Sequence, residues 1–381
     1  MLGKLFNTLV ALYIFKVRIA FCLYHNHDLN IYSELLINDS NKANTYHKHL
    51  LKEQHNQDEY NNYFEKLCPK PEDIAPCLCV LDTEHSELNL DCRAVVDITQ
   101  LQNVFQAEFP ETSFNRLDMS RSSITVLPSG VFGNITFKHM DFLISSLEVV
   151  EDGAFGGSVE TLKDLSFQYC NITQFPFESI KNFKVIESIW LRGNKYSAIP
   201  SFESDTLKWM TLGSPYLTEI PEFLPNTLPA LEDLQFNDSP ITNIVPGHFK
   251  NLHGLQSLSF RWLQLSGVLT ANSFVWDEGQ VVTWIDLFHN NYYKIEPGAI
   301  QFTEGMYVDI RFNLMDTLEE EVWRPLLELN GTLEVQGLDI NCDCGIAWIV
   351  TNPQFLEYTV DAFCADGTSF FDLDPKDYID C

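Results

Sequence analysis

The sequence predicts an α/β-type solenoid: a curved array of about ten coils, with a parallel β-sheet on the concave side and a short, irregular convex side. Three observations predict it. The segment 282–295, VTWIDLFHNNYYKI, fits the pattern LxxLxLxxNxLxxL. The same pattern recurs at intervals of 21 to 27 residues, and four cysteines stand on each side of the recurring region. This pattern is that of a leucine-rich repeat.

Each repeat is expected to form a short strand with two inward apolar residues, followed by an Asn that hydrogen-bonds the backbone where the chain turns. Cysteine is a known substitute at that position, so Cys170 is interpreted as a buried free thiol rather than a nucleophile. Counting from Asn290 places this ladder position at Ser122, Ser145, Cys170, Asn194, Pro215, Ser239, Leu263, Asn290, Asn313 and Leu338.

The convex side is expected to hold extended or one-turn connections instead of long helices. Proline forbids helix continuation from the residue before it, and a proline follows the closing residue of four coils. Gly-x-Phe segments should supply the aromatic residue that packs behind the strand. The residues concerned are Pro128, Pro176, Pro200 and Pro221, and Phe132, Phe155 and Phe249.

The first 67 residues differ in composition from the rest. Lys4 precedes an apolar run over 5–15, which is too short for a membrane span of about 20 residues and suits a signal peptide. The following stretch is rich in Asn and His without a metal-ligand spacing, so it is interpreted as a polar linker. The predicted organisation is a signal peptide at 1–22, a partly disordered linker at 23–67, an N-terminal cysteine cap at 68–113, repeats at 114–340 and a C-terminal cysteine cap at 341–381.

Eight cysteines flank the repeats and predict disulfide-bonded caps of an extracellular chain. Four lie before the repeats, at Cys68, Cys77, Cys79 and Cys92, and four after them, at Cys342, Cys344, Cys364 and Cys381. In the C-terminal cap we expect Cys342 to pair with Cys364 and Cys344 with Cys381. A zinc site is disfavoured because the Cys-x-Cys spacing with long arms fits it poorly, and no metal is predicted.

The net charge of −29 belongs entirely to residues 68–381, because basic and acidic side chains cancel before them. An acidic chain disfavours nucleic acids and anionic membrane surfaces as partners, since both need a basic face. No later segment approaches 18 uninterrupted apolar residues, so no membrane anchor is predicted and the chain is expected to be secreted.

The concave side is the predicted binding face, because it gathers aromatic and arginine side chains of the types enriched in interface hot spots. Trp209 and Trp284 are expected to flank the strands on the same side. The alternative is that these aromatics only stack across coils and stiffen the sheet. The predicted partner-binding residues are Tyr169, Trp190, Arg192, Arg261, Trp262, Asp286, Phe288, His289, Asp309, Arg311 and Phe312.

Sequons for N-glycosylation occur at Asn38, Asn134, Asn171, Asn237 and Asn330, which agrees with a secretory route. Those within the predicted folded region, Asn134, Asn171, Asn237 and Asn330, are the predicted glycosylation sites. A glycan on Asn237 would stand on the concave sheet and obstruct the middle of the predicted binding face.

No catalytic motif is present: neither a GxSxG nucleophile elbow, nor HExxH, nor a phosphate loop, nor a dinucleotide fingerprint. Asp286, His289 and Asp309 are expected on adjacent strands, but they have no nucleophile and no pocket. The sequence therefore predicts a protein without catalytic activity and without a cofactor.

Three segments resemble a family of arthropod secreted leucine-rich repeat proteins named after the non-catalytic subunit of the shrimp luciferin 2-monooxygenase. They are EVWRPLL at 321–327, NCDCGIAWIVTNP at 341–353 and CADGTSFFDLDPKDYIDC at 364–381. The cap CPKPEDIAPCLC and the phrases VFQAEFP and FPFESI are similar too, so the resemblance covers about 68–381. It implies pairing of Cys68 with Cys79 and of Cys77 with Cys92. The Asn- and His-rich leader departs from the family.

The resemblance implies a leucine-rich subunit that accompanies a separate catalytic chain. The sequence is thus interpreted as a secreted, non-catalytic binding or scaffold protein with a protein partner. One alternative is an extracellular matrix or innate-recognition module that binds a protein or glycan without any luciferase. Another is an oxygenase that consumes a coelenterazine-type substrate by itself, which turnover by the purified chain alone would reveal.

Overall fold

The computed structural model describes residues 66–82, 85–222 and 227–381, and residues 65–381 form one compact unit. The predicted signal peptide and all of the predicted linker except Lys66 and Leu67 lie outside the described residues. Within the described ranges, no helix has the length and apolar character needed to cross a membrane.

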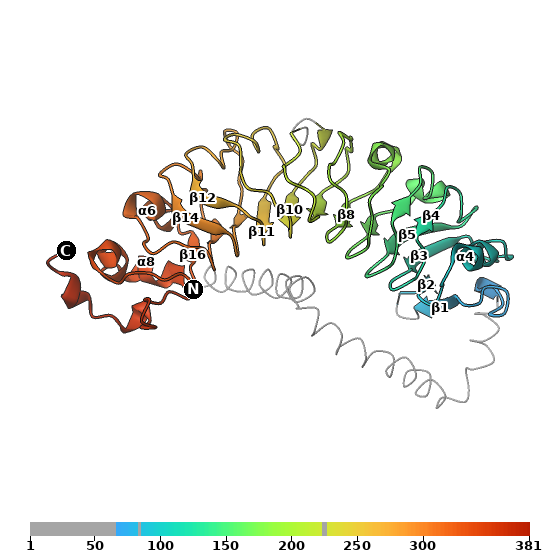
Figure 1. Cartoon of the computed structure of the whole chain (residues 1–381), viewed down its shortest axis with the longest axis horizontal. Coiled ribbons are helices and arrows are strands. Elements are labelled where there is room, and N and C mark those ends of the chain that lie inside the picture. Colours follow the sequence, from blue (N-terminus) through green and yellow to red (C-terminus); the bar gives the residue numbers. More distant parts are fainter. Residues whose placement is uncertain (1–65, 83–84, 223–226) are drawn as a thin grey trace, which may run out of the picture. The chain divides into compact units, whose positions relative to one another are not determined.

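A sheet of 13 strands runs through this unit, in the order β1-β2-β3-β5-β7-β8-β9-β10-β11-β13-β15-β16-β17. The strands line the inner side of the arc, and the connecting segments lie outside them (Figure 1). Only β1 and β2 pair antiparallel, whereas the later strands pair parallel. The strands are β1 Leu78–Asp82, β2 Glu87–Asp91, β3 Ser113–Asp118, β5 Thr136–Asp141, β7 Asp164–Ser166, β8 Ser188–Leu191, β9 Trp209–Leu212, β10 Asp233–Asn237, β11 Ser257–Arg261, β13 Trp284–Asp286, β15 Tyr307–Asp309, β16 Thr332–Glu334 and β17 Thr359–Val360.

The strands form here because each coil alternates inward apolar and outward polar residues. In β13, Ile285 is fully buried and lies opposite Val308 of β15, so neighbouring coils share one continuous core. Strands β3 to β16 supply one strand for each of the ten predicted coils. The predicted leucine-rich repeat solenoid is confirmed.

The ladder residues bond successive coils at the turn after each strand. Asn194 donates from Nδ2 to the carbonyls of Phe167 (2.6 Å) and Leu191 (2.8 Å) and accepts at Oδ1 from the amide of Ile172 (3.2 Å). Cys170 is buried and free, and its Sγ donates to the carbonyl of Phe142. The prediction of a buried structural thiol is confirmed.

The ladder assignment at Pro215 is wrong, because Ser214 occupies that position. Ser214 is fully buried and its Oγ donates to the carbonyl of Tyr196 (2.6 Å), whereas Pro215 is exposed. In the other nine coils the residue before the ladder residue has a positive φ, which Gly213 does not have. This coil therefore lacks one turn residue, and the Gly213 amide bonds to the Tyr196 hydroxyl instead (2.8 Å).

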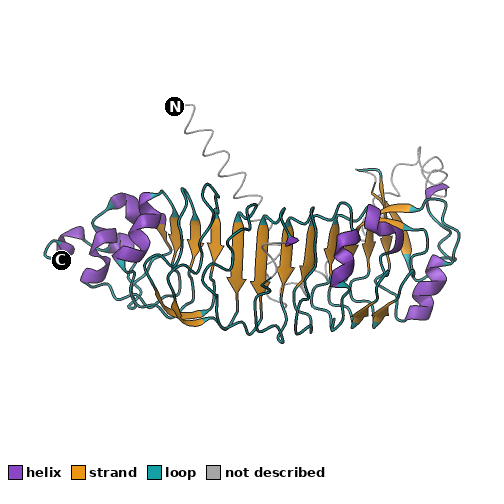
Figure 2. Ribbon diagram, turned by 90° about the horizontal axis from the view of Figure 1, so that it is seen from above, coloured by secondary structure: helices purple, strands orange, loops and turns teal. Residues whose placement is uncertain are grey.

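The convex connections are mostly short, as predicted. They comprise the 3-10 turns η2 (Gly156–Glu160) and η3 (Phe177–Asn182) and two small parallel sheets, β4 (Val126–Leu127) with β6 (Val149–Val150) and β12 (Ser266–Leu269) with β14 (Asn291–Ile295). Figure 2 shows these small sheets at the side away from the main row of strands. The Gly-x-Phe aromatics Phe132, Phe155 and Phe249 are all buried.

One convex helix, α6 (Glu320–Glu328), goes beyond the short connections that the prolines predicted. Its buried residues Val322, Trp323, Leu326 and Leu327 recur at helical spacing, so one face packs on the last coil. Pro325 lies inside this helix, and the apolar face outweighs its missing amide.

Disulfides hold the two ends of the stack. They join Cys68 to Cys79, Cys77 to Cys92, Cys342 to Cys364 and Cys344 to Cys381, which are the expected pairs. Helix α4 (Ile98–Phe105), capped by Asp97, packs at the N-terminal end. The C-terminal end contains η4 (Cys344–Ile346), α7 (Ala347–Val350), α8 (Pro353–Tyr358), η5 (Phe370–Asp372) and η6 (Pro375–Tyr378).

Candidate binding surface

Four columns of side chains cross the concave face, because the strands pair in register. In β13 and the turn after it, the members are Trp284, Asp286, Phe288 and His289. Their counterparts in the next coil are Tyr307, Asp309, Arg311 and Phe312. Each column thus places side chains of adjacent coils one strand spacing apart, about 4.8 Å.

The predicted partner-binding residues fall into two groups on this face. Tyr169, Trp190 and Arg192 lie on and just after β7 and β8. The other eight belong to β11, β13, β15 and the turns after them. The coils of β9 and β10 separate the two groups, so the predicted residues do not form one continuous surface.

The first group is small, and two of its three side chains contact neighbouring residues of the same chain. The Arg192 Nε donates to a carboxylate oxygen of Asp238 (2.8 Å), and the Arg192 guanidinium lies 5.4 Å from the Tyr169 ring centre. A Cβ at Gly193 would be 2.6 Å from the Tyr169 ring, so this glycine makes room for the ring. All three predicted residues of this group are half-buried.

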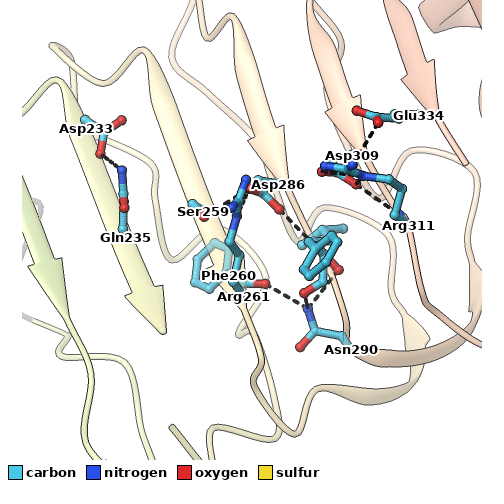
Figure 3. A network of polar contacts seen from close by, with 12 residues as sticks. Asp233, Gln235, Ser259, Phe260, Arg261, Asp286, Asn290, Asp309, Arg311 and Glu334 are labelled. Carbon is cyan, nitrogen blue, oxygen red and sulfur yellow. Dashed lines mark hydrogen bonds and ion pairs between the residues drawn. The ribbon is translucent and has the colours of Figure 1, made fainter. Parts of the chain in front are cut away.

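An acid–arginine cluster joins four residues of the second group to one more carboxylate (Figure 3), and it comprises Arg261, Asp286, Asp309, Arg311 and Glu334. Arg261 pairs with Asp286 through Nε, and Ser259 donates to the same carboxylate. Arg311 bonds both oxygens of Asp309 and reaches Glu334 with its other nitrogen (2.9 Å). Two guanidinium groups therefore form ion pairs with three carboxylates.

Two of the predicted binding residues are not presented to solvent. Asp286 is 1% exposed and Asp309 is 0% exposed, because neighbouring arginine and aromatic side chains cover them. Burial raises the pKa of Asp286, with Arg261 opposing that rise. Burial, together with the charges of Asp361 and Asp286, raises the pKa of Glu334 to about 7. These carboxylates hold the two arginines in place.

Three adjacent turns project an exposed row of rings, Trp262, His289 and Phe312, which we call the edge row. Trp262 is 47% exposed and Phe312 is 42% exposed. Their φ angles are +57°, +54° and +53°, a left-handed conformation that bulky side chains rarely adopt. Arg121, Ile144, Tyr169 and Asp238 have the same conformation at this turn position, so it belongs to the repeat and the exposed rings are what distinguish these three coils.

Sequence reasoning missed the stacked partner of Trp284. The Trp284 and Tyr307 rings lie parallel at 4.1 Å in the column at the start of the strands. Extending the alternation of each strand by one residue toward its N-terminus would have found Tyr307. Extending the column of Asp286 and Asp309 by one coil would have found Glu334, which lies opposite Asp309 between the apolar residues Leu333 and Val335.

The sequons differ in accessibility. The side chains of Asn134 and Asn330 are exposed and that of Asn171 is half-buried. Asn237 is 3% exposed, because it lies in β10 within the sheet. Its amide is therefore not presented to a glycosylating enzyme in the folded chain, and the glycan on Asn237 stays a prediction.

Asp286, His289 and Asp309 do not form a proton-transfer arrangement. The His289 ring stacks on Trp262 at 3.7 Å, while both carboxylates bond to arginines. Within the described residues, no group of three or more His, Cys, Asp or Glu side chains could hold a metal ion. The chemistry of this face is that of packing and fixed ion pairs.

Comparison with known proteins gives one relative of similar length. No family model matches the chain. The chain is 28% identical over 311 residues to the Oplophorus-luciferin 2-monooxygenase non-catalytic subunit of Oplophorus gracilirostris, covering 81% of this chain and 86% of that protein. The relative is thus similar over nearly its whole length.

Solved structures with some similarity include a leucine-rich repeat protein from Bacteroides eggerthii, with a TM-score of 0.46 and 18% identity over 68% of this chain and 45% of that chain. A TLR13–ssRNA13 complex has a TM-score of 0.45 and 16% identity, over 65% of this chain and 31% of that chain. Human 5T4 has a TM-score of 0.40 and 16% identity, over 81% of this chain and 97% of that chain. This chain spans less than half the length of the first two.

Proposed function

We propose that this chain is an extracellular, non-catalytic leucine-rich repeat subunit that binds a protein partner through the edge row and Phe288. The observation that carries the proposal is the edge row itself, where three adjacent coils hold exposed rings. At the same turn position in two other coils, Gly193 and Gly337 also have a positive φ, which glycine adopts without strain. Large exposed aromatics at such a place favour a partner contact.

Two further findings support the proposal. The relative is named as a non-catalytic subunit, and a subunit needs a partner chain. Four disulfides suit an oxidising, extracellular compartment. The closed caps leave the stack rigid, which lowers the entropy lost when a partner binds.

Removing the edge row should abolish partner capture while the solenoid stays folded. In the variant Trp262→Gly with Phe312→Gly, both rings are lost and the left-handed backbone becomes favourable, so the fold should tolerate the change. Affinity capture from the native extracellular fluid, followed by mass spectrometry, should recover a protein with the wild-type chain and at least tenfold less of it with this variant.

Ile144→Gly is the matched control, because Ile144 occupies the same turn position, has φ +56° and is 40% exposed. This control should capture the partner as the wild type does. Equal capture by the edge-row variant, or no protein captured by the wild-type chain, would contradict the proposal.

A further inference from the structure

The carboxylates of the acid–arginine cluster outnumber its arginines by one. All three carboxylates belong to buried residues, and their ion pairs are with Arg261 and Arg311. A buried carboxylate needs hydrogen-bond donors or a cation to stay charged, because burial removes the water that would otherwise stabilise the charge. The donors inside the cluster therefore decide which carboxylate is least stabilised as an anion.

The two aspartates of the cluster are well supplied with donors. Asp309 accepts from the Arg311 amide (3.0 Å), from its Nε (3.0 Å) and from its Nη2 (2.7 Å). Asp286 accepts from the Phe288 amide (2.9 Å), from a hydroxyl and from a guanidinium. Each aspartate thus has three donors, one of which is a main-chain amide two residues further along the chain.

Glu334 has less support than either aspartate. Its Oε1 meets the Arg311 Nη1 at 2.9 Å, and among the described residues no main-chain amide donates to this carboxylate. Asp309 lies opposite Glu334 in β15, and Asp361 follows β17 on the other side, so both neighbouring strands bring negative charge toward it. Glu334 is therefore the carboxylate of the cluster that takes up a proton most readily.

Charged groups face Glu334 from the strands on both sides and from two strands further along the sheet. They are Asp309 and Arg311 (β15 and the turn after it), Asp361 (after β17), Asp286 (β13) and Arg261 (β11). Helix α6 lies on the convex side of this coil (Figure 1), toward which the buried Leu333 points. The charged residues of α6 therefore do not face Glu334.

The titration of Glu334 falls far from that of an ordinary glutamate. Burial, followed by the charges of Asp361 and Asp286, raises the pKa of Glu334 to about 7, and Arg261 opposes that rise. The contact with Arg311 also favours the charged carboxylate. We therefore expect the proton to be taken up at or somewhat below neutral pH.

Protonation of Glu334 changes the charge of the surface without dismantling it. Arg311 loses the ion pair at Nη1 but keeps Asp309, which is 0% exposed and accepts from three of its N–H groups. The Arg311 guanidinium also lies 5.1 Å from the ring centre of Phe288, beside the edge row. One proton thus makes the surface beside Phe288 more positive while the bonds that position Arg311 remain.

We propose that Glu334 is a proton-operated switch in the concave face: near neutral pH it takes up one proton, frees the Arg311 Nη1 from its ion pair and makes the surface beside Phe288 more positive. This inference goes beyond the proposed function, because it concerns the chain alone. It can therefore fail while partner capture holds, and partner capture can fail while it holds.

The full chain labelled with carbon-13 at the glutamate carboxyl groups tests the switch by nuclear magnetic resonance. The Glu334 resonance is identified as the one that Glu334→Gln removes. It should titrate with a midpoint above about 5.5, higher than an ordinary glutamate reaches. Asp361→Asn should lower this midpoint, because Asp361 opposes ionisation, and Asn tolerates the φ of +50° at this position. A midpoint at or below about 5.5, or one that Asp361→Asn does not lower, overturns the proposal.

The release of Arg311 has its own readout. The Nε–H resonance of Arg311, identified as the one that Arg311→Lys removes, should shift with the same midpoint as Glu334. In Glu334→Gln this shift should disappear. A resonance that does not respond to pH in the wild type, or that responds equally in Glu334→Gln, refutes the coupling between the two side chains.

Stability gives an independent measurement. Because the folded pKa of Glu334 is raised, its contribution to stability is present below the unfolded pKa and is lost as the pH rises through the folded pKa. The unfolding equilibrium constant of the wild type, divided by that of Glu334→Gln, should therefore rise at least about threefold from pH 5 to pH 8. Glu328→Gln, at an exposed position of α6, is the control and should keep the wild-type pH dependence. His289 is present in every chain, so its titration cancels from the ratio. A smaller rise, or a fall, contradicts the switch.

Discussion

Arg261→Leu should lower the free energy of unfolding by about 3–5 kcal/mol at neutral pH, because it leaves Asp286 buried without its cation. Asp286 is 1% exposed and pairs with Arg261 through Nε. Chemical denaturation of the wild type and the variant measures this difference. Losing the contact between the Arg261 guanidinium and the Phe288 ring should lower the free energy of unfolding by a further, smaller amount.

The pH dependence of this loss has a definite sign. In the variant, the pKa of Asp286 should rise further above its unfolded value, because burial and Asp309 raise it and, once Arg261 is gone, only the Phe288 amide still opposes them. Its contribution to stability is present below the unfolded pKa and is lost as the pH rises through the folded pKa. The difference from the wild type should therefore shrink when the pH is lowered toward about 4.

A double variant separates charge from packing. Asp286→Asn removes the charge but keeps an oxygen that can accept from the Phe288 amide, as Asp286 does now (2.9 Å). Arg261→Leu combined with Asp286→Asn should recover at least half of the loss. If the single variant is as stable as the wild type, the pair does not hold this part of the sheet together.

Asn194→Leu should destabilise the chain by about 2–5 kcal/mol, because a buried amide and two buried carbonyls each lose the bond to Asn194, and of the carbonyls that of Leu191 keeps the Tyr196 hydroxyl (3.2 Å). Those groups belong to Ile172, Phe167 and Leu191 in two adjacent coils. The loss should therefore weaken the contact between the coils. Denaturant unfolding measures it.

Asn290→Leu is the internal comparison. Asn290 also donates two bonds, to the carbonyls of Phe260 and Leu287, but in the described part of the chain its Oδ1 has no hydrogen-bond partner. This variant should cost about 1–2 kcal/mol less than Asn194→Leu. Equal losses in both variants would mean that the bond to the Ile172 amide contributes nothing.

The repeat period is why so much of the fold could be predicted. A stacked coil must return to the same register every turn, so the apolar positions of one coil, such as Ile285 and Leu287, predict those of the others. The turn at Ser214 was not predicted because the residue missing before Ser214 is offset by an extra one after it, so Leu212 and Leu217 keep the usual apolar spacing. Helix α6 was not predicted because the convex side was inferred from prolines in four earlier coils, which say nothing about the coil that contains 320–328.

The site was harder to predict than the fold. Alternation along a strand tells which face a residue is on, but on a concave face it does not tell whether solvent reaches it. Asp286, Asp309 and Asn237 all lie on the predicted face and are all buried. Long neighbours such as Arg261 and Phe288 cover the short ones, and this depends on side-chain conformations that no sequence spacing encodes.

The exposed rings were predicted more successfully than their arrangement. Trp262, His289 and Phe312 lie at the expected turns and are exposed. Their strained backbone could not be inferred from residue type, because Gly193 and Gly337 occupy the same position in other coils. The stacking of Trp284 on Tyr307 also agrees with the alternative that aromatics stiffen the sheet, so stacking alone does not separate the two interpretations.

Hydroxyl-radical footprinting of the captured complex tests the binding surface most directly. Oxidation of Trp262, Phe288 and Phe312 should fall at least threefold in the complex relative to the free chain, because the partner would cover them. Phe371, which is 63% exposed in the C-terminal cap, is the internal reference and should be oxidised equally in both. Unchanged oxidation of the edge row in a complex that protects another face would contradict a binding site on these coils.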